Sequence, residues 1–188
     1  IIKVDNRFVA EGTETPMIPR VGLRMQLSEI LNDLTYYGRG PEENYRDRRT
    51  SQFIGEYTTP IKDLYEPYIR PQENEHRTDI YWCALTTKQK AGLLFIADRT
   101  FELNASNYLL GSLDSGETID NGAPRTNETN HRHLTDPQPV KQVDMFIDYR
   151  MMGVGGDNSW GAIAHEPYLI RPGVENAIEY GFSIVPFD

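Results

Sequence analysis

Arg20-Val21-Gly22-Leu23-Arg24-Met25-Gln26-Leu27 alternates between polar and apolar residues, and this alternation decides the fold class. Successive side chains of a β-strand point to opposite faces, so a period of two predicts a strand with one buried face. The same alternation returns in residues 143–151 and 178–184. We therefore expect an all-β protein, built as a large antiparallel sandwich.

Two apolar runs are expected to form central strands of the sheet. They are Asp79-Ile80-Tyr81-Trp82-Cys83-Ala84-Leu85 and Gly92-Leu93-Leu94-Phe95-Ile96-Ala97. Uninterrupted apolar runs of this length are typical of strands that are covered on both faces. Residues 27–34 have helical spacing but are too short, and we interpret them as a turn or a bent strand. Turns are also expected at residues 38–41, 70–74 and 171–173, where Gly and Pro gather.

Composition narrows the class of protein. A length of 188 residues indicates one domain, spanning 1–188, with a substantial core. The net charge of −9 argues against a nucleic-acid surface, and no apolar run is long enough to span a membrane. The single cysteine, Cys83, is expected to be a buried thiol. Because Ile1-Ile2-Lys3-Val4 reads as mid-strand, we expect a fragment of a longer protein.

Met152-Gly153-Val154-Gly155-Gly156-Asp157-Asn158-Ser159-Trp160-Gly161 carries the strongest functional signal. The loop-forming glycines Gly153, Gly155 and Gly156 leave the backbone free to adopt positive φ. A large aromatic ring on such a loop suits a platform at the lip of a pocket. We predict that Trp160 binds substrate, since its flat face can stack on the C–H face of a sugar.

Two alternatives accompany the prediction for this loop. Asp157 and Asn158 are either substrate-binding groups that contact sugar hydroxyls or residues whose side chains hold the loop in Asx turns. The indole of Trp160 could instead fold back as a lid on the core.

Four segments, in this order, resemble the C-terminal domain of family 2 glycoside hydrolases of the β-galactosidase type, the domain also described as domain 5 or the small chain. The resemblance covers about residues 16 to 185, and Thr129-Asn130-His131-Arg132-His133-Leu134 adds to it. The four segments are Pro19-Arg20-Val21-Gly22-Leu23, Tyr37-Gly38-Arg39-Gly40-Pro41-Glu42-Glu43-Asn44-Tyr45 continuing to Asp47-Arg48, Pro67-Tyr68-Ile69-Arg70-Pro71-Gln72-Glu73-Asn74 with Arg77, and residues 152–161.

The resemblance implies both a fold and a parent activity. The fold would be the C-terminal part of a supersandwich related to galactose mutarotase. The parent enzyme would hydrolyse terminal β-D-galactosides with retention of configuration, using two glutamates of a (β/α)8 barrel that this chain lacks. No catalytic residue is therefore expected here. The residue that matches the family's tryptophan in the aglycone subsite is Trp160.

The resemblance also implies partners and ions. The partners would be a lactose-like β-galactoside, the catalytic barrel and other domains of the parent chain, and a second copy in a homo-oligomer; nucleic acid and membrane are not expected. Mg²⁺ and Na⁺ are implied for the parent enzyme, but no metal ligand or cofactor is assigned to this segment. The protein would be soluble, in the bacterial cytoplasm or periplasm. Glu75 departs from the family, which often has glycine after the Gln-Glu-Asn turn.

The carboxylates nearest to glycosidase chemistry are Glu42, Glu43 and Glu73. A retaining site needs two carboxyl groups about 5 Å apart, one of them with a raised pKa. We interpret Glu43 and Glu73 instead as members of a structural network, because a buried charge persists only when it is paired. The cations expected to pair with them are Arg39, Arg48 and Arg77.

Three other functions remain open from the residues alone. An aldose mutarotase or epimerase would need an acid and a base, for which His131 or His133 with Glu73 are the candidates. The His-x-His spacing could also hold a metal, although a solvated or hydrogen-bonded pair is the simpler interpretation. A stand-alone carbohydrate-binding domain would use Trp160, aided by a tyrosine platform. A purely structural domain would serve packing and oligomerisation.

Overall fold

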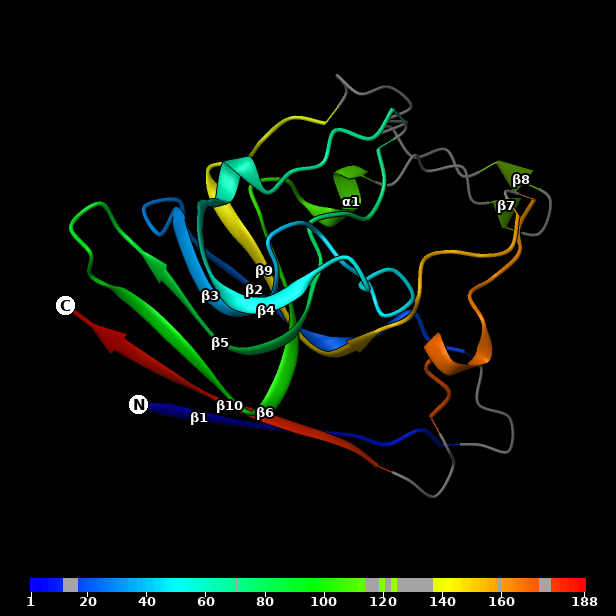
Figure 1. Cartoon of the computed structure of the whole chain (residues 1–188), viewed down its shortest axis with the longest axis horizontal. Helices are drawn as coiled ribbons and strands as arrows, with labels where there is room; N and C mark the ends of the chain where they lie inside the picture. Colours follow the sequence, from blue (N-terminus) through cyan, green and yellow to red (C-terminus); the bar gives the residue numbers. More distant parts are fainter. Residues whose placement is uncertain are drawn as a thin grey trace.

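The computed structural model describes residues 1–11, 17–69, 71–113, 119–120, 123–124, 137–158, 160–172 and 177–188. Within them nearly all of the regular secondary structure is β-strand (Figure 1). The elements, in order, are β1 (Ile2–Phe8), β2 (Arg20–Ser28), β3 (Asp33–Gly40), β4 (Phe53–Pro60), η1 (Ile61–Asp63), β5 (Arg77–Thr86), β6 (Gly92–Ser106), α1 (Leu110–Leu113), β7 (Ile119–Asp120), β8 (Ala123–Pro124), β9 (Gln142–Met151), η2 (Glu166–Tyr168) and β10 (Ile178–Phe187).

Eight of the described strands form one antiparallel sheet that divides at its longest strand, β6, while β7 and β8 pair with each other. The first half of β6 lies between β10 and β5, and the path runs β1-β10-β6-β5-β3-β4. The second half pairs with β9, which in turn pairs with β2. Register shifts between β5 and β6 mark the place where the sheet bends. Two sheet halves joined by one strand give the sandwich-like arrangement expected from the sequence.

The hydrophobic core collects side chains from β3, β5, β6, β9 and β10. Each fully buried aromatic or aliphatic side chain contributes about 1.5–3 kcal/mol relative to an exposed one. Cys83 is among these residues, and burial raises the pKa of its thiol, as expected for a packing cysteine. The largest wholly buried members are Tyr36, Phe95, Phe101, Phe182, Leu34, Ile80, Leu85, Leu103, Met145 and Ile147.

Three local predictions need correction. The turn expected at residues 38–41 is too long, because Gly38 to Gly40 complete β3. The first half of β6 is only partly covered, with Ile96 exposed; the half covered on both faces is its second half. The polar face of β9 was expected to meet solvent, but Asp144 and Asp148 are buried. Residues 27–34, expected to be a turn or a bent strand, comprise the end of β2, a turn over residues 29–32 and the start of β3.

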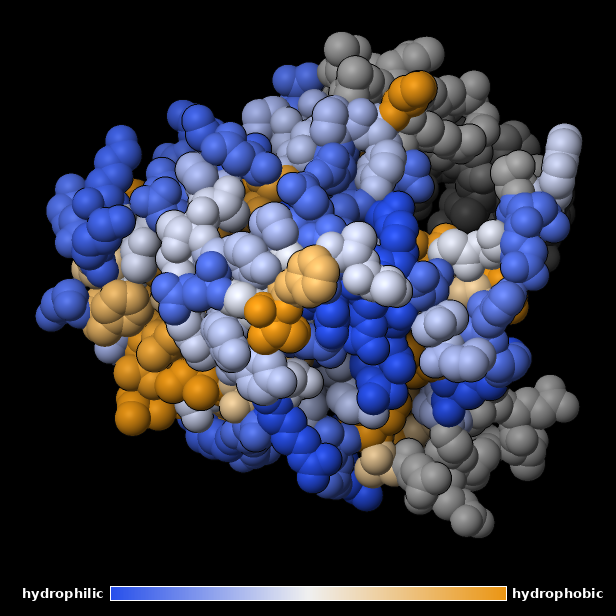
Figure 2. Space-filling model, viewed as in Figure 1, coloured by the Kyte–Doolittle hydropathy of each residue, from blue (hydrophilic) through white to orange (hydrophobic). Residues whose placement is uncertain are grey.

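The face in Figure 2 is mostly hydrophilic. Apolar colour gathers at the lower left, where the N-terminal end of β1 and the C-terminal end of β10 lie in Figure 1. Ile2 in β1 is 61% exposed, and Phe53 at the start of β4 is 72% exposed. Among the described residues, no helix has the length and apolar character needed to cross a membrane.

Candidate functional site

The indole of Trp160 stands in solvent on a loop that follows β9. Its side chain is 92% exposed, the highest value among the exposed large hydrophobic residues of the described chain. The alternative in which this ring closes over the core is therefore wrong. A ring this exposed loses nothing by stacking on a ligand and gains apolar contact area. In Figure 1 the loop lies on the right of the molecule, away from both termini.

The base of the loop is fastened by hydrogen bonds from segments distant in the sequence. The carboxylate of Asp47 accepts bonds from the backbone N–H groups of Val154 (3.2 Å) and Gly155 (2.7 Å). Met152 N donates to the carbonyl of Pro19, and Gly153 N to the carbonyl of Tyr168. An ionised acceptor shared by two backbone amides is stronger than a neutral one. Asp47 is therefore a positioning residue for the loop.

Gly153, Gly155 and Gly156 are needed because neighbouring groups approach them closely, and not because of positive φ. Gly161, at φ 96°, is the only glycine with positive φ among the described residues. A Cβ on Gly153 would lie 2.7 Å from the carboxylate of Asp47, and one on Gly156 would lie 2.1 Å from the carbonyl oxygen of Ala162. The expectation that Gly153, Gly155 and Gly156 free the backbone is thus corrected: they let neighbouring groups come near.

Side chains at the tip of the loop hold its shape. Asn158 Oδ1 accepts a hydrogen bond from Trp160 N at 2.8 Å, an Asx turn that presents the indole. Asp157 pairs with His165 at 2.9 Å, although both side chains are well exposed and the pair is weak. The hydrogen bond of Asn158 matches the alternative in which an Asx turn holds the loop. Contact of Asp157 or Asn158 with a sugar stays a prediction.

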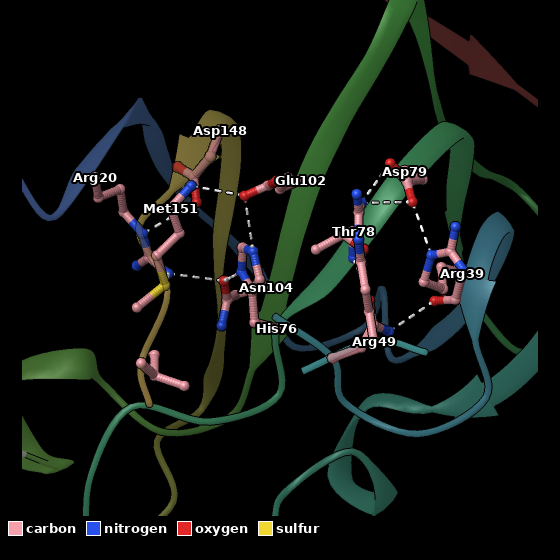
Figure 3. A network of polar contacts seen from close by, with 12 residues as sticks. Arg20, Arg39, Arg49, His76, Thr78, Asp79, Glu102, Asn104, Asp148 and Met151 are labelled. Atoms are coloured by element: carbon pink, nitrogen blue, oxygen red, sulfur yellow. Dashed lines mark hydrogen bonds and ion pairs between the residues drawn. The ribbon is translucent and has the colours of Figure 1, made fainter. Parts of the chain in front are cut away.

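A buried polar network adjoins Met151, where the loop begins (Figure 3). Glu102 of β6 accepts hydrogen bonds from Met151 N (2.6 Å), where β9 ends and the loop begins, and from His76 Nε2 (3.0 Å). His76 Nδ1 contacts Asn104 Oδ1 at 2.7 Å. Both ring nitrogens of His76 face oxygen atoms, an arrangement that favours the imidazolium, which donates from both nitrogens. Burial lowers the pKa of His76, but the hydrogen bond and charge of Glu102 outweigh burial and raise it above its ordinary value.

Arg20 is the central cation of this network. Its guanidinium donates to Glu73 and to Asn104, both at 2.9 Å, and lies 3.0 Å from Asp148. Asp148 is wholly buried, and its oxygens accept no hydrogen bond, so Arg20 supports it by charge alone. Burial raises the pKa of Asp148 to about 7, against the opposing charge of Arg20. A Cβ at position 22 would collide with the carboxylate of Asp148, so the glycine leaves the space that this carboxylate occupies.

Glu43 and Glu73 are network carboxylates, as predicted, but their partners differ in part. Glu43 is bound by Arg48, by the hydroxyl of Tyr68 and by Glu75 N. Glu73 pairs with Arg20, a cation that the sequence analysis did not assign to it.

The other two predicted cations bind elsewhere. Arg39 pairs with Asp79 at 2.7 Å, as the right half of Figure 3 shows. Arg77 donates to the carbonyl groups of Glu75 and Pro41. Their predicted pairing with Glu43 or Glu73 is therefore wrong, because both guanidinium groups have other partners.

Glu75 combines a left-handed backbone with a buried carboxyl group. It has φ 67°, in the left-handed region that favours glycine, and its side chain is 2% exposed. Burial raises the pKa of its carboxyl to about 8, against the opposing effects of Ser106 and Arg77. One of its oxygens has no hydrogen-bond partner. The departure noted in the sequence therefore coincides with a backbone geometry suited to glycine.

The four segments that carry the family resemblance meet here. Arg20 of the first contacts Glu73 of the third, and Glu43 of the second contacts the residue that follows the third. The fourth is bound by Asp47, at the end of the second. Sequence reasoning missed the roles of Asp47, His76 and Glu102. For Asp47, the one signal in the sequence was its place at the end of the second segment of the family resemblance. His76 and Glu102 belong to no recognised motif.

The histidine pair, the tyrosines and the metal ligands are the other candidates that the sequence offered. His131 and His133 lie outside the described residues. Among the tyrosines, Tyr36 and Tyr45 are buried and cannot form a sugar platform. The described part of the chain offers no group of three or more His, Cys, Asp or Glu side chains that could hold a metal ion.

Comparison with known proteins decides the family. The model of the family described as "Beta galactosidase small chain" matches residues 1–184. The chain belongs to the β-galactosidase small-chain family. The expected resemblance is thereby confirmed, and the fold of the small-chain domain is the all-β arrangement described above.

Three relatives illustrate the similarity, each named β-galactosidase. That of Priestia megaterium is 33% identical over 162 residues, covering 86% of this chain and 14% of the relative. That of Vibrio cholerae is 32% identical over 158 residues, covering 84% and 13%. That of Leuconostoc mesenteroides is 31% identical over 168 residues, covering 89% and 14%. The small-chain domain thus spans about one seventh of the length of these relatives.

Proposed function

We propose that this small-chain domain belongs to a retaining glycosidase that hydrolyses terminal β-D-galactosides, and that it supplies Trp160 to the aglycone side of the active site. The observation that carries the proposal is the 92% exposure of an indole on a loop tied down at its base. An aromatic face tolerates different aglycones because stacking needs only an apolar C–H surface. Supporting it, relatives about seven times longer are named β-galactosidase.

The catalytic carboxylates are proposed to lie elsewhere in the longer protein. Glu43 is engaged by Arg48 and Tyr68, and Glu73 by Arg20 and Asn104. A carboxylate held by an arginine is a poor proton donor, since the cation favours its ionised form. Glu75 has a raised pKa but is too deeply buried for a sugar to reach. In this proposal Mg²⁺ and Na⁺ of the parent enzyme bind outside the described residues.

The first prediction concerns the 188-residue chain alone. We expect it to leave a chromogenic β-galactoside such as o-nitrophenyl galactoside unhydrolysed, because Glu43 and Glu73, the carboxylates nearest to glycosidase chemistry, are each held by an arginine. Release of nitrophenol is followed by absorbance, with the small-chain domain in large excess over any contaminant. Turnover that copurifies with the folded chain would overturn the placement of the catalytic groups.

The second prediction concerns Trp160 in the longer protein. Trp160→Ala should lower kcat/KM for galactosides with an aromatic or sugar aglycone by about tenfold, the loss of about 1–2 kcal/mol of stacking. Trp160→Phe, which keeps an aromatic face, should lose less. Hydrolysis of galactosides with a small alkyl aglycone should change little, because such a leaving group offers no face to the ring.

The control for Trp160 is Ile30→Ala, which removes another exposed apolar side chain, in the turn between β2 and β3. It should leave the selectivity among aglycones unchanged. If Trp160→Ala also left that selectivity unchanged, the aglycone role would be rejected. The carbohydrate-binding alternative is tested separately by calorimetric titration of lactose into the small-chain domain; tight binding without any other domain would favour it over an accessory role.

A further inference from the structure

A cleft of about 1040 Å³ opens between the edge of the sheet formed by β1, β10 and β6 and the segment that follows η2. It lies apart from the indole of Trp160, which does not line it. Five arginines line the cleft, although the chain as a whole has a net charge of −9. They are Arg7, Arg46, Arg99, Arg150 and Arg171. Positive charge is therefore concentrated at one place on an acidic protein.

Three of these arginines lack a carboxylate partner within the described residues. Arg7 pairs with Glu179 and Arg171 with Glu166, but no ion pair involves Arg46, Arg99 or Arg150 among the described residues. Arg150 lies over the ring of Tyr149, 4.9 Å from its centroid. The negative charge of Glu102 acts on Arg46, but no ion pair joins the two within the described residues. An unpaired cation in a cleft is ready to bind an anion.

Arg46 makes the strongest case because it is half-buried beside a like charge. Burial lowers the pKa of Arg46, and the charge of Arg150 lowers it further. Two cations held together in a partly desolvated cleft repel each other, and this cost is removed when an anion sits between them. The arrangement is unfavourable for the domain by itself and favourable for a complex.

We propose that this arginine cleft is a docking site for an acidic polypeptide segment, one that carries two or three spaced carboxylates. The lining also holds Asp5, Asp98 and Glu179. These would repel a continuous phosphate backbone but can be avoided by separate aspartate or glutamate side chains. Ala177 and Ile178, both partly exposed, add apolar surface that suits a peptide. The rest of a longer protein is the proposed source of this acidic segment, since the relatives contain about six times more polypeptide outside the matched region than within it.

The cleft is connected to the loop through the chain itself. Arg46 immediately precedes Asp47, whose carboxylate holds the backbone of Val154 and Gly155. A segment docked against Arg46 would therefore fix the residue next to the loop's anchor. The docking site does not depend on the role of Trp160, because it concerns a different surface and a different ligand.

The test is a titration of a fluorescein-labelled pentaglutamate peptide with the 188-residue chain, followed by fluorescence anisotropy at low ionic strength. Arg46→Gln and Arg150→Gln should each weaken binding about tenfold, the value of one charge-assisted contact. Arg99→Gln, an exposed position, provides a second variant if the others fold poorly by circular dichroism. Lys62→Gln and Lys88→Gln remove the same charge at exposed positions outside the cleft and should change binding little.

Competitors distinguish the ligand classes. Inorganic phosphate should displace the peptide only at concentrations far above those of the peptide, and a single-stranded oligonucleotide of equal charge should bind more weakly than the peptide. The proposal is overturned by absence of peptide binding, by equal losses in the cleft and control variants, or by tighter binding of the oligonucleotide or of phosphate. Each of these results leaves the aglycone test of Trp160 untouched.

Discussion

Arg20→Met is expected to lower the free energy of unfolding of this domain by about 3–5 kcal/mol, the range observed when one partner of a buried charge network is removed. Arg20 supports Glu73 and Asp148 at once, at 2.9 and 3.0 Å. Without it, the buried carboxyl of Asp148 would lose the stronger of the two cationic influences, Arg20 and His76, that oppose the effect of burial on its pKa. Since domains of this size are stable by only about 5–15 kcal/mol, the loss is a large share of the total. Urea unfolding of the 188-residue chain measures it.

The matched control is Arg7→Met, which removes an arginine from an exposed pair with Glu179. Exposed pairs contribute at most about 1 kcal/mol, so this variant should unfold close to the parent midpoint. A rescue experiment isolates the charge: Arg20→Met combined with Asp148→Asn should recover part of the loss, because the uncompensated carboxylate is then gone. Equal midpoints for Arg20→Met and Arg7→Met would show that the network contributes little to stability.

The periodic part of the fold was predictable from the sequence because burial on one face repeats every second residue. Residues 20–27, 143–151 and 178–184 all lie in the strands that their alternation predicts. The exposed position of Trp160 was also predictable, because turn-forming residues surround it. These signals are local, and they depend on a few neighbouring residues only.

The buried polar network could not be predicted, because local sequence signals do not identify partners on other strands. Asp144 and Asp148 occupy the polar face of an alternating strand, which normally meets water, but here arginines of β2 and residues 73–76 cover that face. Nothing near Asp148 in the sequence indicates that Arg20, on another strand, will compensate it. Likewise Asp47 holds a loop more than one hundred residues away. Partner choice among several arginines is a tertiary property, which explains why Arg39 and Arg77 were misassigned.

The last prediction concerns Glu75, where the backbone and the side chain conflict. Glu75→Gly should raise the free energy of unfolding by about 2 kcal/mol at pH 8. A residue with a Cβ at φ 67° costs about 1–2 kcal/mol relative to glycine, and the buried carboxyl oxygen without a partner adds a further cost. Thermal or urea unfolding at matched pH measures the gain. A less stable Glu75→Gly variant would show that the carboxyl group is needed to hold its surroundings together.

The carboxyl contribution has a defined pH dependence. The pKa of Glu75 rises from 4.5 to about 8 in the folded domain, so between these values the folded state retains a proton that the unfolded chain releases. The folded state therefore binds more protons, and this group lowers stability progressively as the pH increases from about 4.5 to 8. Glu75→Gln removes the titration while keeping the shape of the side chain. Its advantage over the parent should be small at pH 5 and largest at pH 8.

Glu29→Gln supplies the reference for this pH series, because Glu29 is exposed and its neutralisation should give the same small difference at both pH values. Glu75→Gly should differ from Glu75→Gln by an offset that does not vary with pH, since relief of the backbone at φ 67° involves no proton. If Glu75→Gln gained no stability between pH 5 and pH 8, the carboxyl would be ionised and satisfied in the folded domain. The strain at this position would then be a property of the backbone alone.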